Sequence, residues 1–310
     1  MKTEELKQIT FPFSEISENE RNFLIKLDEI IEKAWKIKKK SGMMIRINNS
    51  GILRTLEIDV VENVDNVKLI HLIYQIPTFF PDLFNLGLNI YGLKTLPKSF
   101  NIFRQLKQIY LGNEYLEEIN KDFFSNFSQL KSFAIRGLMK SIPVSIGRLS
   151  NLERLQISKS PHLHSLPPSI GNLSTLFSMT IKEVSLKNLP ETLGHLHNLQ
   201  KLTLHDVSLE VLPESLGDCY RLKELDIRNC NNLTTLPDSI GDLHNLESLK
   251  IYGCLNLESI PDCITDLPQL KYVYFVENPK LDIPVRTQAL LLKKLETFNV
   301  DGCKTKWMNP

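Results

Sequence analysis

Apolar residues recur along the chain in a phrase, Leu-x-x-Leu-x-Leu, whose second half alternates apolar and polar positions. Alternation with a period of two predicts a half-buried strand. The spacing of the phrase, 22 to 25 residues, is typical of an array of stacked repeats. The phrase begins at Leu83, Leu106, Leu130, Leu152, Leu176, Leu199, Leu222, Leu246, Leu270 and Leu295, and an irregular earlier copy begins at Leu53.

A second landmark follows each predicted strand and keeps the same period. Proline fixes φ and is expected to end the strand. The series is interrupted once, at Asn120. The prolines are Pro97, Pro143, Pro167, Pro190, Pro213, Pro237, Pro261 and Pro284.

The stretch after each proline, as in Ser239-Ile240-Gly241, has apolar residues three and four positions apart. This spacing predicts a short helix with its apolar stripe turned inward. Its first serine is expected to cap the helix by accepting hydrogen bonds from free backbone amides.

These elements together predict an α/β solenoid. A strand of three or four residues cannot bury its apolar face alone, but it can when it is stacked against identical neighbours. Strands take less room per repeat than the helical limb does, so the stack is expected to curve. The parallel sheet should line the concave face, and the short helices should line the convex face.

Four phrases carry a resemblance to a known family: LPPSIGNLSTL, LPETLGHLHNL, LPESLGDCYRL and LPDSIGDLHNL. They resemble leucine-rich repeats of the 23–24-residue, plant-like class. That class is common in plant intracellular Ras-group-related leucine-rich-repeat proteins, in plant immune receptors and in effectors of bacterial pathogens. The resemblance covers Leu83 to about Cys303. It implies a curved leucine-rich repeat array that recognises a protein, and it leaves the partner's identity open.

The ends of the chain depart from the repeat. Residues 1–52 do not repeat, and "SENERNFLIKLDEIIEKAWKIKKK" predicts an amphipathic helix with a capping box formed by Ser17 and Glu20. We expect an N-terminal helical cap over the first repeat, with a separate partner-binding helix as the alternative. The expected parts are therefore the cap (1–52), the repeats (53–294) and a closing strand and tail (295–310), in which Trp307 covers apolar surface.

Five cysteines and no apolar N-terminal stretch predict free thiols in a reducing, cytoplasmic compartment. Cys230, Cys254 and Cys303 each follow their repeat's first leucine by eight residues, and Asn278 holds the same position. The family resemblance implies that this position is an inward ladder of Asn or Cys side chains that hydrogen-bond loop backbone. Cys230 and Cys254 are therefore expected to be buried and reduced.

Composition argues against several other functions. The formal net charge of +1 does not favour nucleic-acid binding, and no apolar run approaches the length of a membrane span. His195, His197 and His244 are expected to be solvated on the convex side, because no carboxylates accompany them at spacing that suits a metal. No phosphate loop, nucleophile elbow, dinucleotide motif or Cys-x-Asp motif occurs, so we expect no enzyme activity, no cofactor and no metal.

The residues at offsets two, four and six from each first leucine should face the concave side. They predict a basic band, tempered by Glu224 and Asp226, and a tyrosine patch near the C-terminal end. Tyrosine and arginine are enriched at interface hot spots. The predicted partner-binding residues are Arg136, Arg154, Lys182, Lys201, His205, Arg228, Lys250, Tyr252, Tyr272 and Tyr274.

We therefore expect a monomeric, non-enzymatic module that binds a partner protein through its concave face. The resemblance to effectors implies a bacterial protein, delivered by a secretion system, that acts on a host protein. The alternative is the substrate-recognition component of a ubiquitin-ligase assembly, in which the N-terminal helix recruits other components.

Overall fold

A computed structural model describes residues 17–38, 42–47, 53–60 and 66–304 of the chain. Contacts divide the chain into two compact units, unit 1 (residues 1–139) and unit 2 (residues 140–310). The division into 1–52, 53–294 and 295–310 follows the repeat register and stays a prediction, and Trp307 lies outside the described residues.

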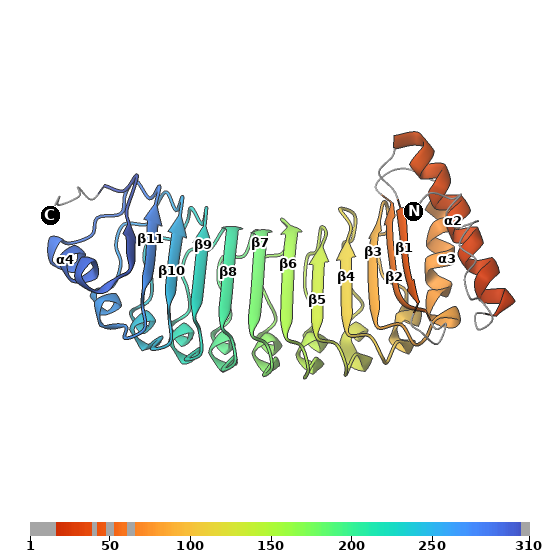
Figure 1. Ribbon diagram of the computed structural model, residues 1–310, viewed down its shortest axis with the longest axis horizontal. Helices are drawn as coiled ribbons and strands as arrows, with labels where there is room; N and C mark the ends of the chain where they lie inside the picture. The colour runs from red at the N-terminus through yellow and green to blue at the C-terminus, as the bar shows by residue number, and fades with distance from the viewer. Residues whose placement is uncertain (1–16, 39–41, 48–52, 61–65, 305–310) are drawn as a thin grey trace. The chain divides into compact units, whose positions relative to one another are not determined.

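Unit 1 combines the first repeats with a helical N-terminal region (Figure 1). Strands β2 to β5 pair in parallel and in chain order, whereas β1 pairs with β2 in the antiparallel sense. The antiparallel β1 was not predicted from the sequence. The elements are α2 (Glu18–Lys38), β1 (Gly42–Ile47), β2 (Leu53–Val60), α3 (Asn66–Phe79), β3 (Asn85–Ile90), η1 (Lys98–Ile102), β4 (Gln108–Gly112), η2 (Phe123–Asn126) and β5 (Ser132–Arg136).

The predicted N-terminal helix is present as α2, and its capping box is confirmed. The Ser17 amide donates to Glu20 Oε2 (2.7 Å), and the Glu20 amide donates to Ser17 Oγ (3.2 Å). Phe23 is buried and stacks on Phe79 of α3, with the ring centroids 4.6 Å apart. The apolar stripe predicted for this helix consists of Phe23, Leu24, Leu27, Ile30, Ile31, Ala34 and Trp35, and the side chains of the last four lie outside the described part of the structure.

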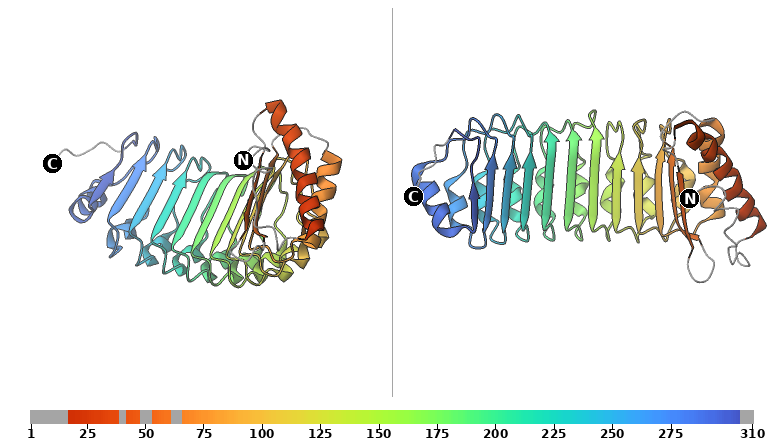
Figure 2. Two further views of the ribbon diagram at one scale, coloured as in Figure 1. Left: turned by 45° about the vertical axis from the view of Figure 1, so that its right-hand side comes forward. Right: turned by 45° about the horizontal axis from the view of Figure 1, so that its top comes forward.

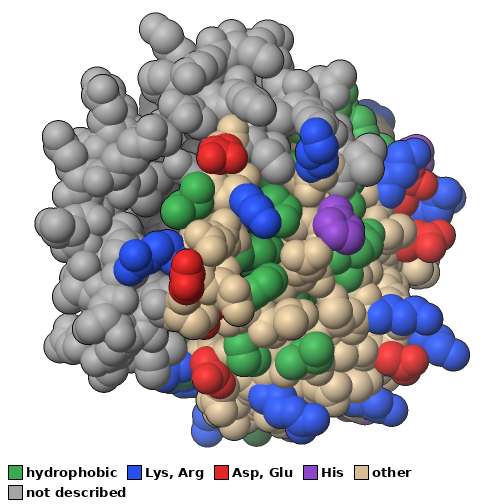
Figure 3. Space-filling view, turned by 90° about the vertical axis from the view of Figure 1, so that its right-hand side faces the viewer, with side chains coloured by type: hydrophobic (Ala, Val, Ile, Leu, Met, Phe, Trp, Pro, Cys, Tyr) green, Lys and Arg blue, Asp and Glu red, His purple; other side chains and the backbone are tan. Residues whose placement is uncertain are grey.

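The core of unit 1 is rich in phenylalanine. Phe124 is 1% exposed and meets Phe123 and Phe133 edge to face, with centroids 5.1 and 4.9 Å apart. Edge-to-face pairs add to the free energy gained by burying the rings. Figure 3 views the molecule from the end that carries α2, and basic and acidic side chains are interspersed on the described part of this face.

Unit 2 is a more regular stack. Strands β6 to β12 pair in parallel and in chain order (Figure 2). Each strand begins two residues after a first leucine, so the predicted register is confirmed. The elements are η3 (Val144–Arg148), β6 (Arg154–Ser160), η4 (Pro168–Asn172), β7 (Ser178–Val184), η5 (Glu191–His195), β8 (Lys201–Val207), η6 (Glu214–Asp218), β9 (Glu224–Arg228), η7 (Asp238–Asp242), β10 (Ser248–Tyr252), η8 (Asp262–Asp266), β11 (Tyr272–Val276), α4 (Val285–Lys294) and β12 (Thr297–Asn299).

The solenoid fold predicted from the repeats is confirmed, and most of its short helices are single 3-10 turns. The predicted serine cap is wrong. Proline occupies the N-cap of η4, and no side chain caps this turn. Ser169 Oγ instead donates to the Val144 carbonyl of the preceding repeat (2.8 Å), as Thr192 Oγ1 does to the Pro168 carbonyl (2.7 Å). These side chains therefore link adjacent repeats.

The ladder after the strands is present in unit 2. Asn278 is fully buried, donates to the Ile251 carbonyl (3.0 Å) and accepts from the Cys254 amide (2.8 Å). Cys230 and Cys254 are also fully buried, and both are free thiols. The ladder therefore satisfies loop backbone groups that would otherwise be buried without partners.

Burial should make the ladder thiols unreactive in the native state. The hydrogen bond to Cys254 and desolvation raise the pKa of Cys230, and burial raises the pKa of Cys219 to about 12. The same hydrogen bond lowers the pKa of Cys254, so for this thiol it is burial that keeps the reagent away. Because the thiolate is the reactive form and all three thiols are fully buried, a maleimide reagent should modify Cys230, Cys254 and Cys219 only after unfolding. Cys263 and Cys303 are partly exposed and provide internal controls. Fast labelling of Cys230 and Cys254 in the native protein would contradict the ladder assignment.

The residue just before the ladder position has a left-handed backbone in every repeat of unit 2. Gly253 has φ +63°, and Glu183 has φ +54° in its own repeat. A Cβ atom added at Gly253 would lie 2.5 Å from Asn229 Oδ1. Because non-glycine residues lose about 1–2 kcal/mol in this conformation, Gly253→Ala should lower the free energy of unfolding by about that amount. Denaturant melts measure it.

Glu183→Gly is the matched control, because it makes the opposite change at the equivalent position. The ion pair of Glu183 with Lys159 is long (3.8 Å) and exposed, so its loss costs little. Glycine relieves the backbone strain at this position, but it also raises the entropy of the unfolded state, which offsets part of the gain. The net effect should be a rise in the free energy of unfolding of up to about 1 kcal/mol. Destabilisation by both substitutions would contradict the explanation by backbone strain.

Candidate binding surface on the strand face

We call the exposed side of strands β6 to β12 the strand face. On β10, Leu249 and Ile251 are buried, whereas Ser248, Lys250 and Tyr252 are partly exposed. This alternation confirms that offsets two, four and six point outward. Of the predicted site residues, Arg136 lies on β5 of unit 1, where its Nη2 pairs with Glu114 Oε1 (2.8 Å). The others all lie on the strand face of unit 2.

The first strands of unit 2 carry two of the predicted cations. The Arg154 guanidinium lies 4.7 Å from the centroid of the Phe177 ring, and its ion pair with Glu153 is long (3.9 Å). Stacking on an aromatic ring orients a guanidinium without neutralising its charge. On β7, Lys182 stands beside His205 of β8 in the strand register. This part of the strand face therefore keeps positive charge.

Glu224 lies between two lysines of the predicted band. Lys201 Nζ lies 2.8 Å from Glu224 Oε2, and Lys250 Nζ donates to Glu224 Oε1 at 2.7 Å. Partial burial alone would raise the pKa of Glu224, but the two lysines hold it below its usual value. The lysines of the band are therefore partly neutralised, as expected from the presence of Glu224, but the pairing of both lysines with one carboxylate was not predicted.

Asp226 is the second acidic centre, and its side chain is only 7% exposed. Arg228 binds both of its oxygens, through Nε (2.8 Å) and Nη2 (2.9 Å). His205 Nε2 lies 3.4 Å from Asp226 Oδ1. Desolvation would raise the pKa of Asp226, but the Arg228 hydrogen bonds and charge hold it below its usual value. The forked Arg228 contact fixes the guanidinium in one orientation.

The three predicted tyrosines form a contiguous patch on β10 and β11. The Arg228 guanidinium lies 4.9 Å from the Tyr252 ring centroid, and Tyr252 stacks on Tyr274 with centroids 6.3 Å apart. The Tyr272 hydroxyl donates to Glu296 Oε2 (2.7 Å). Each ring therefore has a neighbour that limits its rotamers, so little side-chain entropy remains to be lost on binding.

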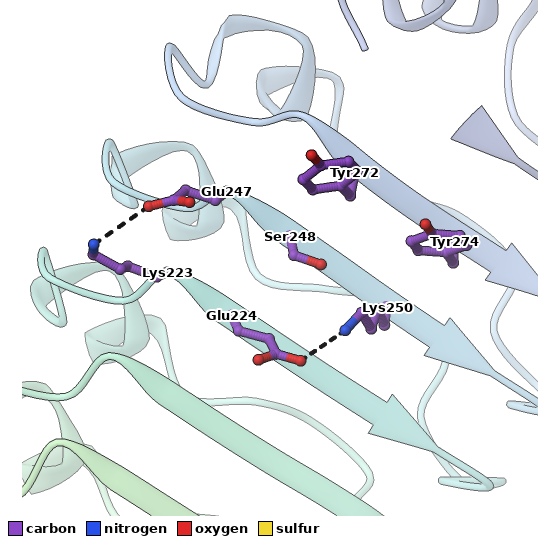
Figure 4. Close-up of a pocket in the computed structure, with 7 residues that line it drawn as sticks. All are labelled: Lys223, Glu224, Glu247, Ser248, Lys250, Tyr272 and Tyr274. Carbon is purple, nitrogen blue, oxygen red and sulfur yellow. Dashed lines mark hydrogen bonds and ion pairs between the residues drawn. The ribbon is translucent and has the colours of Figure 1, made fainter. Parts of the chain in front are cut away.

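The patch borders an open hollow of about 410 Å³ (Figure 4). Tyr272 and Tyr274 of β11 lie on one side, Glu224 of β9 lies on the other, and Ser248 and Lys250 of β10 lie on the strand between them. The Ser248 hydroxyl between them has no hydrogen-bond partner among the described residues. A hollow with aromatic walls and a few polar groups is suited to an anchoring side chain of a partner.

Sequence reasoning missed part of this surface. Glu247, which pairs with Lys223 (3.4 Å), lines the hollow, and Glu296 orients Tyr272. Both occupy offset one, which was not counted among the outward rows. The repeat register itself could have placed them beside the outward offset-two row, because adjacent offsets lie within side-chain reach.

The side of unit 2 formed by the 3-10 turns, the turn side, carries the predicted solvated histidines. His197 is exposed and stacks on the exposed Tyr220, with centroids 5.3 Å apart. His244 is exposed on the next repeat but one. Within the described residues, no group of three His, Cys, Asp or Glu side chains is placed to hold a metal ion.

Two family models match the chain. A model described as "Leucine-rich repeat region" matches residues 88–232, and one described as "At1g61320/AtMIF1, LRR domain" matches residues 171–306. No curated protein sequence matches. The repeats, the fold and these matches identify the chain as a leucine-rich repeat protein, consistent with the plant-like class that the sequence resembles.

Solved structures with the same fold come from bacteria and plants. The leucine-rich repeat domain of the type III effector XCV3220 (XopL) is 20% identical, with a TM-score of 0.65, over 94% of this chain and 95% of that one. The Leptospira interrogans protein LIC12759 is 22% identical (TM-score 0.56; 72% and 68% covered). The Arabidopsis thaliana receptor kinase ectodomain GASSHO1/SCHENGEN3, solved with CASPARIAN STRIP INTEGRITY FACTOR 2, is 22% identical (TM-score 0.60; 91% and 32% covered). At these identities the likeness concerns the fold. Among the described helices, none is long and apolar enough to cross a membrane.

Proposed function

We propose that this protein is a non-enzymatic recognition module that binds a partner protein through the strand face of unit 2. The observation that carries the proposal is the patch of Tyr252, Tyr272 and Tyr274 beside an open hollow. Interface energy is concentrated in aromatic and arginine side chains that are held in place beside pockets. Arg228, held by Asp226 against Tyr252, adds a pre-oriented guanidinium to the patch.

The proposed setting is a bacterial effector that acts on a host protein as a monomer in the host cytoplasm. Support comes from the plant-like repeat class that the sequence resembles, which also occurs in bacterial effectors, and from the fold shared with the XCV3220 (XopL) domain over nearly the whole of both chains. Leucine-rich repeat domains are generally protein-interaction modules, and the receptor ectodomain described above was solved with a bound partner.

The test is capture from a eukaryotic cell lysate on the immobilised full chain, with mass spectrometry of the retained proteins. A true partner should be retained by the wild type and by the turn-side variant His197→Ala/His244→Ala. It should be lost on the strand-face variant Tyr272→Ala/Tyr274→Ala. If the partner is lost on the turn-side variant and retained on the strand-face variant, the binding site lies on the turn side and the proposal is wrong.

The same experiment tests the ubiquitin-ligase alternative. If the chain is a substrate-recognition component, ubiquitin-ligase subunits should be retained by both variants, because they would bind away from the strand face. Retention of a partner without such subunits favours the simple recognition module.

A further inference from the structure

Three nitrogen-bearing side chains stand side by side at offset six of neighbouring strands. Lys182 on β7 is in register with His205 on β8, which is in register with Arg228 on β9. Neighbouring strands lie about 4.8 Å apart, so one small anionic group can contact two of these side chains at once.

The charges of this row do not cancel. Arg228 is neutralised by its forked contact with Asp226. Lys182 has no ion pair with any acid in the part of the chain that the structure describes. His205 Nε2 lies 3.4 Å from Asp226 Oδ1, and this contact is an ion pair only when the imidazole is protonated. The row therefore keeps about one positive charge at neutral pH, and it gains a second when His205 is protonated.

We propose that this row, formed by Lys182, His205 and Arg228, binds an aspartate or glutamate side chain of the partner protein, and that binding strengthens on acidification. The inference rests on the proposed function and names the chemistry that the partner must present. Any anion bound here lies near the buried carboxylate of Asp226 and is repelled by it. A carboxylate brings one negative charge to this place, whereas a phosphate group brings nearly two and is repelled more strongly.

The direction of the pH effect follows from the groups that face His205. Burial lowers the pKa of His205, Asp226 on β9 raises it, and Lys182 on β7 and Arg228 on β9 lower it, with a net decrease from the usual value. A bound carboxylate would favour the imidazolium and raise the pKa of His205 in the complex. Affinity should therefore be highest below the pKa of the free protein, and the gain should be lost as pH rises through the pKa of the complex.

The probe is fluorescently labelled hexaglutamate, and the measurement is fluorescence anisotropy with the full chain at low salt. Binding should be about threefold to tenfold tighter at about pH 6 than at about pH 7.5, because a pKa change of one unit corresponds to at most tenfold. Lys182→Gln should weaken binding by about fivefold at both pH values. His205→Gln should abolish the pH dependence. The matched control is Lys187→Gln, which removes the same charge from an exposed residue in the loop after β7.

Several outcomes would overturn the inference. These are an absence of hexaglutamate binding, equal effects of Lys182→Gln and Lys187→Gln, or pH dependence that survives in His205→Gln. A phosphoserine peptide that binds more than about tenfold tighter than hexaglutamate would indicate a phosphate site instead. If partner capture from lysate still depends on the tyrosines in any of these cases, the proposed function stands and only the carboxylate site is wrong.

Discussion

Replacing Tyr272 and Tyr274 together with alanine should weaken partner binding by about 3 kcal/mol or more, which is roughly a hundredfold in Kd. Both rings border the hollow on the strand face, and Tyr274 also supports Tyr252 by stacking. The double variant therefore removes two anchors and frees a third ring. Calorimetry or surface kinetics with the captured partner measures the loss, which should lie mainly in the dissociation rate.

Two further variants distinguish the loss of tyrosine contacts with the partner from a general effect of removing an exposed tyrosine. Tyr220→Ala removes an exposed tyrosine from the turn side and should leave Kd unchanged. Tyr272→Phe keeps the ring and loses only the hydrogen bond to Glu296, so it should weaken the free energy of partner binding by less than about 1.5 kcal/mol. The thermal midpoint of the double variant should stay near that of the wild type, because both side chains point away from the leucine core. An unchanged Kd for the double variant would refute the tyrosine site.

Phe124→Ala should lower the free energy of unfolding by about 3–5 kcal/mol. Phe124 is 1% exposed and lies between Phe123 and Phe133, so its removal leaves a cavity and breaks two edge-to-face contacts. Denaturant melts give the total effect. Hydrogen exchange should show faster opening of β4 and β5, because stability in repeat arrays depends on each repeat and its neighbours.

The control for Phe124 is Tyr110→Ala, which removes an exposed ring from β4 of the same unit. This substitution should lower the free energy of unfolding by less than about 1 kcal/mol, because the ring is exposed and buries little apolar surface. Equal costs for the two variants would mean that the phenylalanine cluster does not hold unit 1 together.

The local pattern of apolar and polar residues was sufficient to predict the strands. Each strand from β3 to β12 begins two residues after a first leucine, because the alternation of apolar and polar residues specifies both the strand and its buried face. The ladder was predicted from the family resemblance, since Asn278, Cys230 and Cys254 fall at the one offset from that leucine where the family has inward Asn or Cys side chains. The capping box at Ser17 and Glu20 was predictable because its partners are three residues apart.

The predictions were wrong or incomplete where the structure depends on contacts between different elements. A serine near the start of a helical turn is typical of an N-cap, but proline occupies the N-cap of η4, and Ser169 donates to the preceding repeat instead. Strand β1 pairs with β2 by an antiparallel contact that no repeat encodes. In both cases the partner lies on another element, so local sequence does not identify it.

The sequence by itself therefore determined the repeat, the strand register, the buried leucines and the rows that face outward. Only the tertiary structure decided how the side chains within those rows combine. Lys201 meets Glu224 directly across the strands, whereas Lys250 reaches Glu224 diagonally. Arg228 binds Asp226 on its own strand and contacts the Tyr252 ring on the next strand. These pairings leave Lys182 and His205 as the least neutralised part of the predicted band, because charge on a packed surface depends on neighbours in space.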